Sequence, residues 1–192
     1  GRKVVMASPS FLATVQAARR FAARLVRIRL SPPEFSLGRQ PLLEELEGPC
    51  LVIIDNPNNP TGRLLLDGET VEDILAHPDT LLVVDEAYFE FSGLTFAGLV
   101  DDHPNLAVAR TLDKAFSLAG ARVGYLIAGR AFLEAFCAFY SFLPQASLQA
   151  ALEALRQPGY MWNNVQQVIS ERERLRQELQ ILGAIVHPSN TN

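Results

Sequence analysis

A lysine near the middle of the chain has neighbours that suit amine chemistry. Lys114 lies three residues after Thr111, which directly follows the run LAVAR, and Arg122 follows eight residues further on. A lysine that attacks a carbonyl must first lose its proton, and both burial and a nearby positive charge lower its pKa. Lys114 is therefore a candidate nucleophile, and Arg122 is a candidate source of that positive charge.

Other polar and aromatic residues also follow strand-like runs. LVIID leads into NPNNPTG, a turn-forming stretch that contains Asn59, and LLVVD ends in Asp85 with Tyr88 three residues later. Phe11 stands just beyond the first apolar run. Each has an ordinary structural interpretation when taken alone: a turn, a helix cap or salt-bridge partner, or core packing. A solvated lysine is the corresponding interpretation of Lys114.

The apolar runs predict an α/β fold. They occur at 4–6, 25–28, 51–54, 81–84, 106–109 and 123–128, with helix-like segments between them. The runs are continuous rather than alternating, which is typical of strands covered on both faces in a mostly parallel sheet sandwiched by helices. Sites in such sheets form at the carboxyl ends of the strands, where the candidate residues stand.

Helices and a domain boundary follow from the remaining pattern. The predicted helices span 10–21, 67–75 and 165–182. Asp67 or Gly68 is expected to cap the second helix, and Gly183 to end the third. Strand signals cease after Pro144 until the run AIV at 184–186. We therefore expect one domain over 1–144 and the start of another over 145–192.

Composition excludes several functions. The 192 residues carry a net charge of −4 without a dense basic cluster, which argues against nucleic-acid binding. The longest uncharged stretch, 135–152, contains Pro144 and three other polar or turn-forming residues in its second half, so no membrane span is predicted. No export signal is recognised, and Cys50 and Cys137 lack metal-ligand spacing. These features predict a cytoplasmic protein with reduced, buried thiols and no metal site.

The order of the motifs NPNNPTG, DEAY and TLDKAFSLAGARVGY resembles that of the pyridoxal-phosphate (PLP) aminotransferases of fold type I. Within them it is most similar to the histidinol-phosphate aminotransferases, over essentially the whole chain. The resemblance implies the large PLP-binding domain of that fold and part of a smaller C-terminal α+β domain. It does not fit nucleotide binding, because neither G-x-G-x-x-G nor G-x-x-x-x-G-K-[ST] occurs.

The resemblance assigns a role to each candidate residue. Lys114 would hold PLP as a Schiff base and then move the substrate α-proton, and Asp85 would pair with the pyridine nitrogen. Asn59 and Tyr88 would hydrogen-bond the phenolic oxygen, and Phe11 would stack on the ring, where the family usually has tyrosine.

The same resemblance places two further residues at the cofactor phosphate. Arg122 is expected to meet it, and Thr111 offers a hydroxyl. The family usually has serine just before the lysine, whereas this chain has Asp113, which cannot donate a hydrogen bond when ionised. We expect Asp113 either to turn toward Arg122 or another donor, or to weaken phosphate binding.

The activity that the resemblance implies is amino transfer between glutamate and a phosphorylated keto compound in histidine biosynthesis, by a homodimer. A threonine-phosphate decarboxylase is one alternative. Another is a scaffold that keeps the fold and binds no cofactor. The family's N-terminal arm, its phosphate-binding glycine loop and its carboxylate-binding arginine have no counterpart here, so the chain is expected to be the middle of a longer polypeptide.

Overall fold

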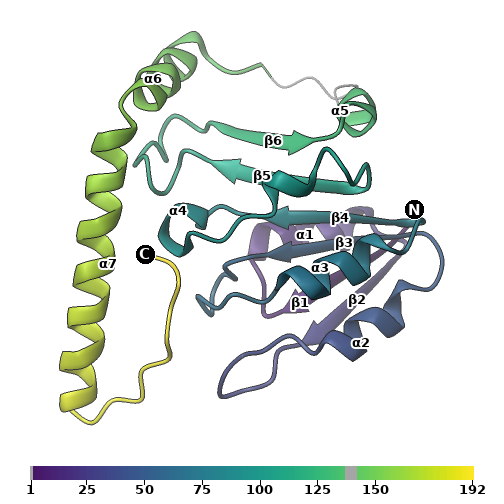
Figure 1. Cartoon of the computed structure of the whole chain (residues 1–192), viewed down its shortest axis with the longest axis horizontal. Coiled ribbons are helices and arrows are strands. Elements are labelled where there is room, and N and C mark those ends of the chain that lie inside the picture. Colours follow the sequence, from purple (N-terminus) through teal and green to yellow (C-terminus); the bar gives the residue numbers. More distant parts are fainter. Residues whose placement is uncertain (1, 137–141) are drawn as a thin grey trace.

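The computed structural model describes residues 2–136 and 142–192, and its centre is a six-stranded sheet (Figure 1). The strand order is β2-β1-β3-β4-β5-β6. β1 to β5 are parallel, and β6 is antiparallel to β5. The strands are β1 (Lys3–Ser8), β2 (Arg24–Arg29), β3 (Cys50–Asp55), β4 (Thr80–Asp85), β5 (Leu106–Thr111) and β6 (Gly124–Ala128). The predicted mostly parallel α/β sheet is confirmed, and each predicted run lies in one of these strands or overlaps it.

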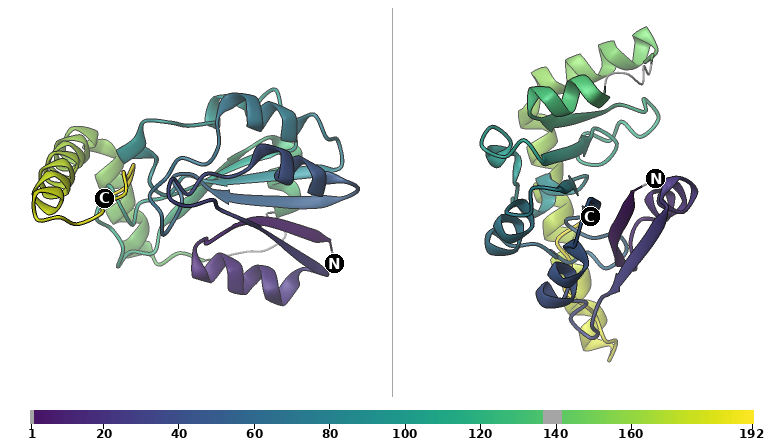
Figure 2. Two further views of the ribbon diagram at one scale, coloured as in Figure 1. Left: turned by 90° about the horizontal axis from the view of Figure 1, so that it is seen from below. Right: turned by 90° about the vertical axis from the view of Figure 1, so that its right-hand side faces the viewer.

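Helices cover both faces of the sheet (Figure 2). They are α1 (Leu12–Phe21), α2 (Arg39–Leu43), α3 (Gly68–Leu75), α4 (Phe89–Ser92), α5 (Arg130–Phe136), α6 (Gln145–Arg156) and α7 (Pro158–Ile181), with short 3₁₀ turns at Glu44–Leu46 and Ala97–Leu99. Alternate strand residues face opposite sides, so Val52 and Ile54 join the core under α2 and α3, while Leu51 and Ile53 pack on the α1 side. Continuous apolar runs are the consequence of this two-sided burial.

Local chemistry explains two helix ends. The Asp67 side chain accepts a hydrogen bond from the Thr70 backbone N–H at 2.8 Å, so Asp67 is the N-cap of α3, as predicted. Gly183 has a φ of +85° after α7, and the next N–H, that of Ala184, bonds back to the Leu179 carbonyl. This arrangement is a Schellman motif and confirms the predicted stop.

Helix α7 lies beside the carboxyl ends of the parallel strands (Figure 1). It begins at Pro158, seven residues before the predicted start at 165. Met161 and Val165 of this helix are buried against Phe91 and Ala115, which lie in α4 and the loop after β5. The first half of α7 therefore supports the loops that follow β4 and β5. The run at 184–186, which resembles a strand in sequence, pairs with no strand in the described part of the chain.

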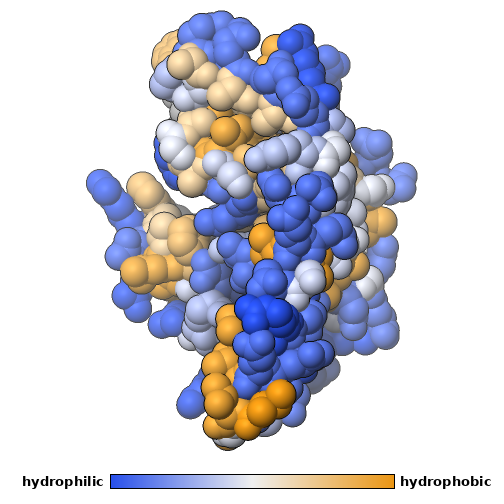
Figure 3. Space-filling view, turned by 90° about the vertical axis from the view of Figure 1, so that its left-hand side faces the viewer, coloured by the Kyte–Doolittle hydropathy of each residue, from blue (hydrophilic) through white to orange (hydrophobic). Residues whose placement is uncertain are grey.

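The second half of α7 is less covered than its apolar stripe predicts. Leu175 is 51% exposed, and Ile181 and Leu182 are more than 80% exposed. Hydrophobic colour gathers at the lower end of this face, where α7 ends, whereas the rest of the helix surface is mostly hydrophilic (Figure 3). None of the helices described over 2–136 and 142–192 has the length and apolarity that crossing a bilayer requires.

One of the two predicted buried thiols is observed. Cys50 is fully buried and free, and its sulfur lies 3.3 Å from the Thr80 hydroxyl oxygen. The prediction for Cys137 lies outside the described residues.

Candidate active site

A pocket of about 250 Å³ lies at the carboxyl ends of β3, β4 and β5. Its lining includes every residue that the sequence predicted for the site: Phe11, Asn59, Asp85, Tyr88, Thr111, Lys114 and Arg122. These residues come from five separate segments of the chain, and parallel strand ends bring them together. The structure thus forms one pocket from positions spread over more than 100 residues.

The NPNNPTG turn orients Asn59 by fixing the asparagines before it. Asn56 is fully buried, and its side-chain amide oxygen accepts hydrogen bonds from the backbone N–H groups of Leu65 and Leu66. Asn58, also fully buried, accepts both the backbone N–H and the hydroxyl of Thr61. Asn59 is only partly buried and lines the pocket. Two asparagines therefore build the turn, and the third is available to a ligand.

Asp85 stands at the end of β4, with a carboxylate oxygen 3.1 Å from the Ala87 backbone N–H. Burial is the main cause that raises the pKa of Asp85, and the neighbouring Asp55 and Glu86 add to it, while the Ala87 N–H and Lys114 act in the opposite direction. A partly buried carboxylate in this state gains most from a cationic partner. The protonated nitrogen of a heterocycle is such a partner.

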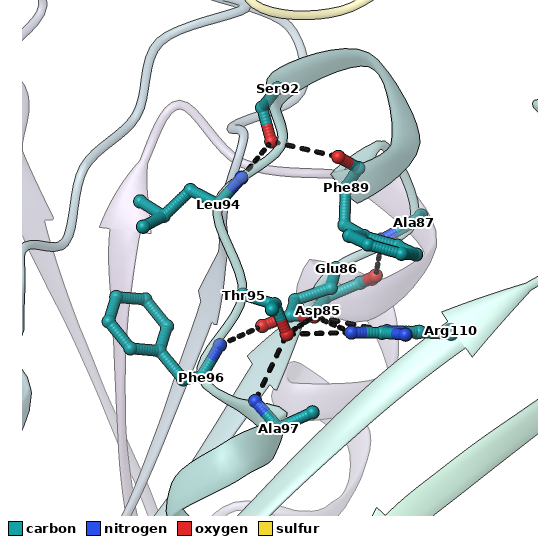
Figure 4. Close-up of polar contacts among 10 residues, drawn as sticks. All are labelled: Asp85, Glu86, Ala87, Phe89, Ser92, Leu94, Thr95, Phe96, Ala97 and Arg110. Carbon is teal, nitrogen blue, oxygen red and sulfur yellow. Dashed lines mark hydrogen bonds and ion pairs between the residues drawn. The ribbon is translucent and has the colours of Figure 1, made fainter. Parts of the chain in front are cut away.

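Glu86 holds the turn after Asp85 in place (Figure 4). Its buried carboxylate accepts hydrogen bonds from the Phe96 backbone N–H at 2.6 Å and from the Thr95 hydroxyl at 2.8 Å. Two Arg110 nitrogens also donate to it, at 2.9 and 3.1 Å, and the Arg110 guanidinium stacks 3.6 Å from the Phe89 ring centroid. A satisfied, buried ion pair thus ties the ends of β4 and β5, from which Asp85 and Lys114 emerge.

Lys114 is half-buried in the loop between β5 and β6. Its amine lies 5.5 Å from the centre of the Tyr88 ring, and the next residue, Ala115, is anchored in the cluster under α7. Two non-glycine residues of the loop, Ser117 and Arg122, have φ values of +56° and +57°. Left-handed backbone at such residues is uncommon and concentrates at functional sites.

Arg122 forms an ion pair with Asp113 and donates to the Ala119 carbonyl oxygen at 3.1 Å. Of the two alternatives expected for Asp113, a turn toward Arg122 or another donor is the one observed. The second carboxylate oxygen of Asp113 is buried and has no hydrogen-bond partner in the described part of the chain. The Thr111 hydroxyl is engaged as well, because it accepts from the Asp113 N–H and donates to the Val123 carbonyl. Both residues expected at the phosphate, Arg122 and Thr111, therefore already have hydrogen-bond partners within the protein.

Two charged residues of the pocket were missed by sequence reasoning. Asp55 ends β3 and Arg110 precedes Thr111 in β5, and both line the pocket. Asp55 resembles the polar end of an apolar run, and Arg110 an ordinary strand-end charge. Their places at strand ends beside recognised motifs were the only available signal.

A second hollow of about 390 Å³ lies between α7 and the C-terminal stretch. Its charged residues are largely paired with each other: Arg174 with Glu171 and Glu178, and Arg172 and Arg176 with Glu173. It contains no lysine and no strand end. The chemistry therefore belongs to the pocket around Lys114.

The sheet order and the pocket define the large domain of a fold type I PLP-dependent transferase. The chain belongs to the aminotransferase class I and II family, whose family model matches residues 1–192. It is 40% identical over 163 residues to a histidinol-phosphate aminotransferase of Thermococcus kodakarensis, covering 83% of this chain and 46% of that protein. A histidinol-phosphate aminotransferase of Sulfurisphaera tokodaii is 37% identical over 200 residues, covering 100% of this chain and 56% of that protein. The chain spans about half the length of these relatives.

Solved structures show the same fold. Histidinol-phosphate aminotransferase from Sinorhizobium meliloti, in complex with pyridoxal-5′-phosphate, superposes with a TM-score of 0.89 at 29% identity, over 100% of this chain and 54% of that one. L-threonine-O-3-phosphate decarboxylase from Porphyromonas gingivalis superposes with a TM-score of 0.83 at 25% identity, over 100% and 58%.

The side chains of the pocket fit PLP, the cofactor of this family. The pocket offers an amine for a carbonyl in Lys114, a carboxylate for a ring nitrogen in Asp85, and amide and phenol groups for an oxygen in Asn59 and Tyr88. It also presents an exposed aromatic ring, Phe11. The part of the pocket least suited to PLP is the end expected to meet the phosphate, where Arg122 already forms an ion pair with Asp113.

Proposed function

We propose that this chain forms the cofactor-binding part of a PLP-dependent aminotransferase that transfers an amino group between histidinol phosphate and 2-oxoglutarate. The single observation that supports this most is the convergence of Lys114, Asp85, Asn59 and Tyr88 on one pocket. The names of the relatives supply the substrate, because those at 37–40% identity are histidinol-phosphate aminotransferases.

PLP, when bound, supplies a carbonyl that condenses with amines and a pyridinium ring that accepts the electron pair left by a departing proton. Asp85 holds a proton on the ring nitrogen, so that the ring stays cationic. Asn59 and Tyr88 donate hydrogen bonds to the phenolic oxygen. The Lys114 amine would hold the cofactor through its carbonyl and, when free, would serve as the base for the proton on the substrate α-carbon.

The finer assignments belong to the same proposal. We place the PLP-binding large domain at 1–144 and the start of the small domain at 145–192, and α6 begins at that boundary, at Gln145. We also propose a homodimer, as the resemblance implies, and a cytoplasmic location, which suits the reduced, buried thiol of Cys50. The seven pocket residues are proposed as cofactor-binding residues, with Lys114 as the catalytic one.

A decarboxylase that acts on threonine phosphate is the second candidate. It is favoured by the fold match to L-threonine-O-3-phosphate decarboxylase at 25% identity. Both reactions use the same cofactor contacts and differ at the substrate α-carbon, so the pocket described here does not separate them.

The test combines binding with a substrate comparison. Addition of PLP to the purified protein should produce a new near-ultraviolet or visible absorption band that Lys114→Ala lacks. The loaded protein should then form glutamate from histidinol phosphate and 2-oxoglutarate, without release of CO₂ from threonine phosphate. Carbon dioxide release without amino transfer would favour the decarboxylase, and absence of the band would favour a scaffold without cofactor.

A further inference from the structure

Asp55 connects two walls of the pocket. Its side chain belongs to a residue that is only 6% exposed, and one carboxylate oxygen accepts a hydrogen bond from the Ser10 hydroxyl at 2.8 Å. The other oxygen accepts from two backbone N–H groups, that of Phe11 at 3.3 Å and that of Asn59 at 2.8 Å. A single buried carboxylate thus contacts both residues proposed for the ring face and for the phenolic oxygen.

The position of Asp55 in the sheet indicates that Asp55 orients its hydrogen-bond donors, and not the reverse. Asp55 is the last residue of β3, an interior strand of the sheet, and is paired in register with Asp85 on β4. Strand β3 is held by ladders on both sides, of which the β4 ladder reaches Asp55, whereas Phe11 and Asn59 lie in connecting segments. The rigid element therefore supplies the acceptor, and the less constrained segments supply the donors.

Helix α1 has particular need of this acceptor. Its N-cap residue is Phe11, which makes no side-chain capping bond, and its first turn contains no acidic residue. A negative charge near a helix N-terminus is stabilising. Asp55 supplies that charge from another part of the chain, so the start of α1, and the Phe11 ring with it, is set by β3.

A second bond joins the same two segments. The Asn58 side-chain amide donates to the Pro9 carbonyl at 3.2 Å. Removal of the Asp55 carboxylate therefore leaves the segments attached, and it removes the bonds that orient Phe11 and Asn59 together with the bond from Ser10. The variant is expected to fold and to lose alignment within the pocket.

We propose that Asp55 is a positioning residue that fixes the Phe11 ring and the Asn59 amide relative to each other through hydrogen bonds to both backbones. This inference rests on the proposed function, since it gives Phe11 and Asn59 their roles at the PLP ring. Asp55 acts through these residues and not on the substrate.

The experiment compares two substitutions with two controls. Asp55→Ala removes all three acceptor contacts, and Asp55→Asn keeps a single acceptor oxygen. Asp101→Asn, in an exposed turn, is the control for loss of one charge. Val71→Ala, at a fully buried position of α3, is the control for loss of stability without a change at the pocket. Two quantities are measured: amide hydrogen exchange in the absence of PLP, and the PLP dissociation constant under conditions in which every variant is folded.

In Asp55→Ala we expect hydrogen exchange at the Phe11 and Asn59 amides to speed up by about tenfold or more, because each amide loses its hydrogen bond to the carboxylate. The PLP dissociation constant should rise by about tenfold over both controls, with Asp55→Asn between. Unchanged exchange at either amide, or a dissociation constant equal to that of Val71→Ala, would overturn the proposal. If the wild-type protein takes no PLP, the proposed function is wrong, while the exchange data still decide whether Asp55 holds the two segments.

Discussion

Asp55 and Asp85 occupy paired positions at the ends of β3 and β4, and both line the pocket that contains Lys114. Burial raises the pKa of Asp85, and the charge of Asp55 adds to this effect. Two acids at adjacent strand ends make this point of the pocket favourable for a cation. In the proposed function, the protonated ring nitrogen of PLP would be that cation.

Asp85→Asn should therefore impair the chemistry more than the fold. An amide is uncharged, so it no longer holds the proton on the ring nitrogen, and removal of one preorganised charge costs on the order of a hundredfold or more in rate. The free energy of unfolding should change little, because the substitution removes a desolvated charge. Amino-transfer rates and urea unfolding measure the two effects. A nearly wild-type rate would place the ring nitrogen elsewhere.

The Glu86–Arg110 pair should contribute strongly to stability. Arg110→Ala leaves the fully buried Glu86 carboxylate without its cation, and removal of one partner from a buried pair typically costs about 3–5 kcal/mol. Arg130→Ala is the control, since Arg130 pairs with Glu134 at the surface with 91% of its side chain exposed. The control should cost less than about 1 kcal/mol. Equal urea midpoints for the two variants would contradict the assigned role of Glu86.

Glu90 should make the stability depend on pH. Burial raises the pKa of this carboxyl from 4.5 to about 7, with Glu86 adding to the effect and Arg110 opposing it, and one of its oxygens is buried without a partner in the described chain. The folded protein therefore keeps a proton that the unfolded chain releases, and stability falls as pH rises through that interval, by up to about 3 kcal/mol.

Glu90→Gln should flatten this dependence in unfolding measurements between about pH 5 and pH 8. Part of the slope will remain, because burial also raises the pKa of Asp85. Glu153→Gln, at an exposed position of α6, should leave the wild-type slope unchanged. A Glu90→Gln slope equal to that of this control would show that Glu90 is ionised in the folded protein.

Asp113→Ser should tighten PLP binding. The substitution removes an acid from the phosphate end of the pocket, releases Arg122 from its ion pair and supplies a hydroxyl donor. We expect the PLP dissociation constant to fall by about tenfold, since charged hydrogen bonds contribute about 1.5–3 kcal/mol each. Inorganic phosphate should compete more strongly with PLP in the variant. An unchanged or weaker PLP affinity in a titration would show that Asp113 does not face the phosphate.

Much of the fold could be predicted because strands covered on both faces are continuously apolar. The start of α7 could not, since PGYMWNN at 158–164 has no helical apolar period and is held by burial of Met161 against the loops after β4 and β5. The run at 184–186 has strand-like composition, but strand formation needs a partner strand, and this run pairs with none of the six strands of the described chain.

The site was predictable where a motif marked it. Lys114, Asp85 and Asn59 stand in short, recognisable motifs, and the structure brings them to one pocket. Asp55 and Arg110 were not predictable, because their partners lie up to 45 residues away and depend on strand order and register. Sequence spacing identifies the residues that act within a motif, whereas residues that join motifs emerge only from the fold.

The most direct test of the central claim is the site of covalent attachment. The protein is incubated with PLP, reduced with borohydride, digested and analysed by mass spectrometry. We expect a pyridoxyl phosphate adduct on Lys114, none on Lys3, which is the other lysine of the chain, and no labelling in Lys114→Ala. An unmodified Lys114 in folded protein, or labelling that persists in Lys114→Ala, would contradict it.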